Sequence, residues 1–127
     1  MNAAGFVVVG IGAMLGAWMR WGLGVALNSI VPTLPLGTLA ANLVGGFLIG
    51  VAVELVLQLQ LVSAEWRLFI ITGFLGGLTT FSTFSVEAVE LLAVQRYGWA
   101  LLHVSSHLAG SLLMTILGIW SVRTLAG

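Results

Sequence analysis

The residues best suited to chemistry lie in one short stretch, GGLTTFSTFSVE, which runs from Gly76 to Glu87. Five hydroxyl side chains surround two phenylalanines there. Hydroxyl groups donate and accept hydrogen bonds, and the edge of a phenylalanine ring carries partial positive charge, so both kinds of side chain can face an anion. Exposed backbone carbonyls, in contrast, are natural ligands for a cation. The stretch is therefore the first candidate for an ion-handling site.

The glycines of this stretch leave two structures open. Gly73, Gly76 and Gly77 precede Thr79 and Thr80. Glycine weakens a helix, and threonine hydroxyls offer freed backbone other hydrogen bonds, so a local break is one prediction. The other is an intact helix that uses its small residues for close packing. A break inside a membrane would have to be satisfied by protein, water or an ion.

Beyond the threonines, the spacing restricts the surroundings of the segment. On a continuous helix the hydroxyl groups would fall on nearly every side, so they cannot all face lipid. Phe81 and Phe84 share one face, and Glu87 follows Phe84 by three residues. We expect protein or water around this segment.

A second polar series lies near the C-terminus. Its members recur every fourth residue and share one helical face: His103, His107, Ser111 and Thr115. Such a series predicts a polar track or hydrogen bonds between helices. The two histidines could instead bind a metal with Glu87 or Glu90, but the spacing offers no convincing third ligand, so this is the weaker interpretation.

Two further polar residues lie inside apolar segments. Asn42 is expected about two turns into its helix, and its amide can donate to an anion. Arg20 could instead simply extend to the interface. Buried polar groups in a bilayer are costly, and for that reason both are functional candidates.

The elements that must position these residues are membrane helices. The chain has 127 residues, 60% of them apolar and only 6% charged, whereas about a quarter of residues are charged in a soluble domain. Spanning helices need roughly 20 apolar residues, and we place four at about 4–29, 36–59, 66–94 and 97–124. The N-terminal residues lack the basic start of a cleaved signal peptide. We therefore predict an all-α membrane protein with a single four-helix transmembrane domain over residues 1–127.

The arginines predict no preferred orientation. With four spans, Arg67 and Arg123 belong to one side of the membrane, whereas Arg20 and Arg96 belong to the other. The chain has no lysine, so the positive-inside rule is balanced. This balance favours insertion both ways up and an antiparallel dual-topology homodimer. Because a bundle of four packed helices fills its own core, a transport path would lie between or beside subunits.

These segments resemble a known family. GAMLGAWMRW in the first span, GTLAANLVGGFLIG in the second and GFLGGLTTFSTFSVE in the third are similar to the small bacterial fluoride channels of the Fluc (CrcB) family. The resemblance implies passive export of fluoride across the bacterial inner membrane by a dual-topology homodimer with two antiparallel pores. It also implies a structural sodium ion at the dimer centre, held by the backbone carbonyls of Gly76 and Thr79 in a broken third helix.

The resemblance also assigns roles to individual positions. It places Phe81, Phe84 and Asn42 in the pore, with Arg20 at an entrance vestibule. A polar track follows, and its members would be Thr80, Thr83, Glu87, Ser111 and Thr115, with His107 at a variable position beside them. A selective pore of this kind would replace the water around fluoride with a series of donors.

Other classes fit less well. A small dual-topology multidrug or cation exporter needs a carboxylate deep in a spanning helix, typically the first, where this chain has Arg20. A purely structural membrane subunit would leave Asn42 and the hydroxyl groups without a role. We do not expect an enzyme, because no nucleophile, base and orienting group occur at motif spacing.

Overall fold

The computed structural model describes residues 1–60 and 62–127, and its regular elements are all helices. Helix α1 covers Ala3–Leu27, α2 covers Leu36–Leu59 and α6 covers Tyr97–Ala126. The third span is divided into α3 (Ala64–Arg67), a π-helical segment η1 (Leu68–Leu75), α4 (Gly76–Leu78) and α5 (Phe81–Ala93). Leu61, in the predicted connection between the second and third spans, lies outside the described residues.

Within the described residues, four helices are long and apolar enough to cross a membrane. Their bounds, with α3 to α5 taken as one span of Ala64–Ala93, agree with the predicted spans to within a few residues. Side chains cap the starts of α1 and α3: that of Asn2 accepts from the Gly5 amide at 2.7 Å, and that of Ser63 accepts from the Trp66 amide at 3.2 Å. The predicted all-α membrane fold is confirmed.

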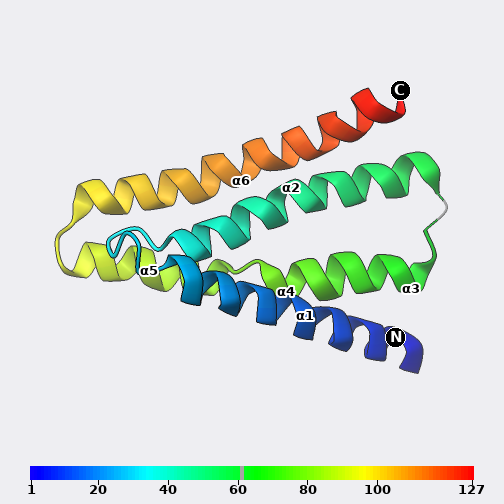
Figure 1. The fold of residues 1–127 in the computed structure, drawn as a ribbon, viewed down its shortest axis with the longest axis horizontal. Coiled ribbons are helices and arrows are strands. Elements are labelled where there is room, and N and C mark those ends of the chain that lie inside the picture. Colours follow the sequence, from blue (N-terminus) through cyan, green and yellow to red (C-terminus); the bar gives the residue numbers. More distant parts are fainter. Residues whose placement is uncertain (61) are drawn as a thin grey trace.

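The helices run back and forth along one direction (Figure 1). Both termini and the α2–α3 connection lie at one end, and the α1–α2 and α5–α6 connections lie at the other. Helix α2 packs mainly against α6, whereas α1 packs against η1 and α4. The chain therefore places Arg67 and Arg123 at one end and Arg96 at the other, as the order of spans predicts.

Glycines allow these helix pairs to approach closely. A Cβ at Gly16 on α1 would collide with the carbonyl oxygen of Phe74, and a Cβ at Gly50 on α2 would collide with that of Thr115. Helix backbones can meet in this way only where side chains are absent. These close contacts fix the third span against α1 and fix α6 against α2.

Candidate functional site

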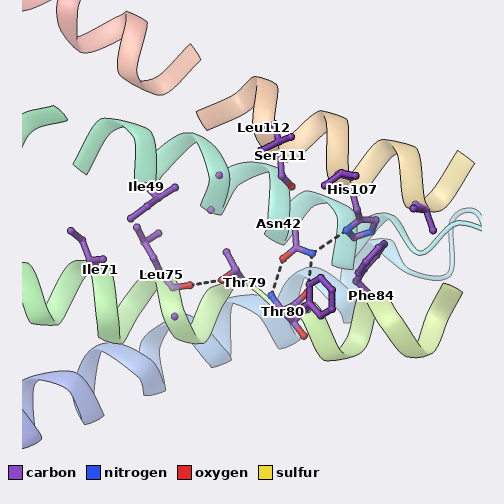
Figure 2. Close-up of a pocket in the computed structure, with 16 residues that line it drawn as sticks. Asn42, Ile49, Ile71, Leu75, Thr79, Thr80, Phe84, His107, Ser111 and Leu112 are labelled. Atoms are coloured by element: carbon purple, nitrogen blue, oxygen red, sulfur yellow. Dashed lines mark hydrogen bonds between the residues drawn. The ribbon is translucent and has the colours of Figure 1, made fainter. Parts of the chain in front are cut away.

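The third span breaks at two threonines (Figure 2). Thr79 (φ −85°, ψ 156°) and Thr80 (φ −149°, ψ 122°) both have extended backbone conformations. Helix α5 restarts at Phe81 with Thr80 as its N-cap, whose Oγ1 accepts from the Thr83 amide at 3.1 Å. The local break is therefore confirmed, and the intact helix is wrong.

Asn42 on α2 holds the extended backbone in place. Its Nδ2 donates to the Thr80 carbonyl at 2.9 Å, and its Oδ1 accepts from the Thr80 amide at 2.8 Å. Because both partners are backbone groups of fixed polarity, they define which amide atom is nitrogen and which is oxygen. The same Nδ2 lies 3.0 Å from His107 Nδ1, so this histidine nitrogen acts as the acceptor.

Arg20 on α1 supports the break from the other side. Its Nε donates to the carbonyl of Gly77 at 3.1 Å. In an unbroken helix that carbonyl would accept from the amide of Phe81. Arg20 thus replaces a lost helical hydrogen bond, in addition to any effect of its charge on ions nearby.

Other carbonyls at the break remain free. Those of Gly76, Leu78 and Thr79 accept no hydrogen bond from any residue that the structure describes. Unpaired backbone carbonyls are costly inside a membrane unless water, another subunit or a cation reaches them. Two of the three, Gly76 and Thr79, are the residues that the family resemblance assigns to sodium, and oxygen donors suit a hard cation of this kind.

A cavity of about 640 Å³ lies beside the break. Much of its lining is apolar, including Ile49 and Leu75, and Figure 2 shows the polar side chains gathered around Asn42. Eight of the residues selected from the sequence line it: Asn42, Gly76, Thr79, Thr80, Phe81, Phe84, His107 and Ser111. The structure therefore brings most of the predicted site together from three separate spans.

Aromatic rings form one border of this cavity. Phe81 and Phe84 meet edge to face, with ring centroids 5.5 Å apart and planes at 66°. Phe84 in turn packs against His107, with centroids 4.7 Å apart, and against His103 at 5.3 Å. Phe81 is 80% exposed in the single chain. Its ring thus extends outward from the subunit instead of closing a finished internal pore.

A second cavity, of about 310 Å³, lies toward α1. Arg20, Asn28 and Thr38 line it, together with Thr80 and Thr83 of the third span. Thr80 borders both cavities. Arg20 therefore lines a recess beside the break, and its place at an entrance stays a prediction.

Two residues of the predicted polar track, Glu87 and Thr115, line neither cavity in the part of the chain that the structure describes. Glu87 accepts through Oε2 from the Thr38 hydroxyl at 2.7 Å. The Thr115 hydroxyl donates to the carbonyls of Gly46 (2.9 Å) and Ser111 (3.0 Å), and so contributes to the packing of α6 on α2. A direct role in ion passage stays a prediction for both.

The sequence reasoning missed Thr38 as a site residue and left His103 out of the selected set. Thr38 precedes Asn42 by four residues and so shares its helical face, which was the available signal. His103 is completely buried, and its Nε2 lies 3.2 Å from the Phe84 carbonyl. Both residues extend the polar group around Asn42 toward Glu87.

This fold and site define a class: a small multi-pass membrane protein with a broken third helix and a polar, aromatic-bordered cavity beside the break. Over residues 7–119 the chain matches the family described as CrcB-like protein, Camphor Resistance (CrcB). The chain belongs to this family.

Named relatives cover almost the whole chain. A fluoride-specific ion channel FluC of Cupriavidus pinatubonensis is 61% identical over 99% of this chain and 100% of that protein. Channels of the same name from Ralstonia nicotianae and Pseudomonas paraeruginosa are 57% and 54% identical, over 98% and 95% of this chain and 99% and 95% of their own length.

Proposed function

We propose that this protein is a fluoride-selective channel that passively exports fluoride across the bacterial inner membrane. The observation that carries the proposal is the 61% identity, over 100% of its length, to a protein named a fluoride-specific ion channel. The cavity adds physical support, because its polar donors come from Asn42 and Ser111 amid an apolar lining. A carboxylate in the first helix, which a cation exporter would need, is lacking in this chain.

The hydrogen-bond donors that are free in the cavity favour passage of fluoride from Ser111 toward Asn42. Among the described residues the Ser111 hydroxyl makes no hydrogen bond, so it is free to donate to an anion in the cavity. Both Nδ2 hydrogens of Asn42 face acceptors, the Thr80 carbonyl and His107 Nδ1. Fluoride would replace His107 as the second acceptor of the Asn42 amide. The two hydrogen bonds between Asn42 and the backbone of Thr80 would stay intact.

Selectivity for fluoride over larger halides would follow from the cost of removing water from the ion. Fluoride is small and strongly hydrated, so water must be replaced by donors at short range. Hydroxyl and amide hydrogens together with the positive edges of Phe81 and Phe84 supply such groups. Larger halides approach the same donors less closely, and several weak sites in a row allow the ion to leave again.

We further propose that the working unit is an antiparallel homodimer with two pores. The exposed ring of Phe81 and the open cavity beside it support this assembly, since a second copy would cover both. The balanced arginines support insertion in both orientations. At the centre of such a dimer, the free carbonyls of Gly76 and Thr79 would hold a sodium ion. The ion would supply a fixed positive charge that joins the two broken helices.

Growth under fluoride stress tests the function in cells. The protein is expressed in bacteria that lack their own fluoride exporter, beside an empty vector. We expect it to restore growth in fluoride-containing medium at mildly acidic pH, where neutral HF enters the cell and releases fluoride inside. Normal membrane expression without any recovery of growth would contradict the proposed function.

A further inference from the structure

Three side chains, two of them buried and one half-buried, meet next to the proposed pore. One ligating atom from each of Glu87, His103 and His107 lies within 4.8 Å of the other two. His103 Nε2 and Glu87 Oε1 are 3.6 Å apart. The third ligand that sequence spacing did not provide for the histidine pair therefore comes from α5. Glu90, the other candidate, is exposed and does not belong to this group.

The same residues carry buried atoms without partners. Glu87 Oε1, His103 Nδ1 and His107 Nε2 have no hydrogen-bond partner among the described residues. The side chain of His103 is 0% exposed and that of Glu87 is 12% exposed. A buried polar atom without a partner is energetically unfavourable. Three such atoms in one small group indicate that something outside the chain completes it.

Neighbouring groups already orient two of the three side chains. The Thr38 hydroxyl donates to Glu87 Oε2 and leaves Oε1 free. His103 Nε2 lies 3.2 Å from the Phe84 carbonyl and 3.6 Å from Glu87 Oε1, so this nitrogen faces the group and serves as a ligand when the ring proton is on Nδ1. An outer hydroxyl on a carboxylate is typical around metal ligands.

We propose that Glu87, His103 and His107 form a binding site for a divalent metal ion of the Zn²⁺ class. Two imidazoles and one carboxylate suit a borderline transition-metal ion, whereas Mg²⁺ and Ca²⁺ prefer sites made only of oxygen. Ligand atoms around a four-coordinate zinc ion lie about 3.3 Å apart, given bond lengths of about 2.0–2.1 Å. The ligand atoms lie up to 4.8 Å apart in the single chain, so the side chains must move closer together to hold the ion. A fourth position remains for water or an anion.

Metal binding is coupled to Asn42 through the proton of His107. Because Nδ1 accepts from the Asn42 amide, the neutral ring carries its proton on the unpartnered Nε2. A metal on Nε2 moves that proton to Nδ1, where it faces the amide hydrogen of Asn42. The contact between Asn42 and His107 must then break, and the metal disturbs the residue that the proposed pore depends on.

The position of the group adds a functional consequence. His107 lines the larger cavity, and Thr38, the partner of Glu87, lines the smaller one. An ion held by the group therefore sits between the two cavities. We expect Zn²⁺ to inhibit fluoride flux, a regulatory property that goes beyond the proposed function.

Direct binding is measured first, with Co²⁺ as a spectroscopic probe on the purified full-length protein in detergent. Wild type and Glu90→Gln, an exposed acid one turn from the group, should both develop the visible absorption of a four- or five-coordinate nitrogen and oxygen site. Zn²⁺ should remove the absorption, and Mg²⁺ should not. His103→Gln and Glu87→Gln should each weaken binding by about tenfold or more, the scale on which metal sites respond to such losses.

Two results would overturn the metal site: no Co²⁺ spectrum in folded wild-type protein, or equal affinity in His103→Gln and wild type. If His103→Gln does not fold, Glu87→Gln carries the same comparison, since glutamine still accepts from Thr38. Inhibition is measured separately, as fluoride efflux with and without Zn²⁺. Efflux that Zn²⁺ does not slow would overturn the inhibitory role. A protein that binds Co²⁺ but conducts no fluoride would contradict the proposed function and leave the metal site supported.

Discussion

At the scale of single residues, the side chain of Asn42 connects two separate spans of the site. It holds both backbone groups of Thr80, and it contacts His107 on α6. One amide on α2 thus connects the broken third span to the fourth. The amide shapes the break as well as the lining of the cavity.

Replacement of Asn42 by alanine should therefore damage structure and transport together. The amide and carbonyl of Thr80 would lose their partners, and we expect a cost of about 1–3 kcal/mol in the free energy of unfolding together with a strong loss of fluoride flux. Asn2→Ala is the matched control, because it removes an amide that only caps α1. Thermal unfolding and liposome efflux measure the two effects. Wild-type flux in Asn42→Ala would refute the role of this side chain.

Phe81 and Phe84, which we assign to the proposed pore, make a more selective prediction. Phe81→Ile and Phe84→Ile keep an apolar side chain but remove the positive ring edge. We expect fluoride efflux to fall severely while the protein elutes at the same volume as the wild type in size-exclusion chromatography. Phe6→Ile, at an exposed position on α1, should leave efflux unchanged. Unchanged flux in both pore variants would show that the rings do not handle the ion.

At the scale of elements, the break in the third span depends on its packing against α1. The backbone of α4 approaches α1 so closely that a Cβ at Gly77 would collide with the carbonyl oxygen of Ala13. Arg20, on the same helix as Ala13, donates to the carbonyl of Gly77. Helix α1 therefore contributes both the steric fit and a hydrogen bond that hold the free carbonyls in place.

Gly77→Ala tests this contact between elements. Backbone atoms cannot yield as a flexible side chain can, so α1 and α4 must separate, at a cost of about 1–3 kcal/mol. We expect a lower unfolding midpoint and reduced flux. Gly10→Ala provides the comparison, because no atom lies within 4 Å of a Cβ at that position. Equal midpoints for the two variants would show that the close contact contributes nothing.

The sequence predicts the helices better than the contacts between them. Charged residues are so sparse that the four spans could be placed to within a few residues, because hydropathy alone dictates them. The glycines and threonines narrowed the third span to two structures but could not choose between them, since Asn42 and Arg20, which stabilise the break, are distant in sequence. The group of Glu87 with two histidines was predicted only as the weaker interpretation, because spacing alone could not show that Glu87 on α5 lies beside the histidines of α6.

At the scale of the whole molecule, the single chain leaves its site open. Phe81 extends outward, and the cavity beside the break is bordered by exposed side chains of α6 such as Leu108 and Leu112. One end of the bundle carries Arg67 and Arg123 and the other carries Arg96, whereas Arg20 lies within α1 beside the break. An antiparallel partner would cover the cavity, and equal insertion in both orientations would supply that partner.

Added charge should separate the two orientations. Val94→Lys with Gln95→Lys adds positive charge at one end, and Gln60→Lys with Val62→Lys adds it at the other. Each double variant should insert one way and lose most of its fluoride flux, because positive residues stay on the cytoplasmic side. Coexpression of the two should restore flux. Full flux from either double variant alone would contradict the antiparallel dimer.

Ion efflux from liposomes tests the central claim most directly. Purified protein is reconstituted into vesicles loaded with potassium fluoride or potassium chloride, a potassium ionophore is added, and the external anion is followed with a selective electrode. We predict rapid fluoride release and negligible chloride release. No fluoride release from correctly folded, dimeric protein, or equal release of both anions, would contradict the assignment as a fluoride-selective channel.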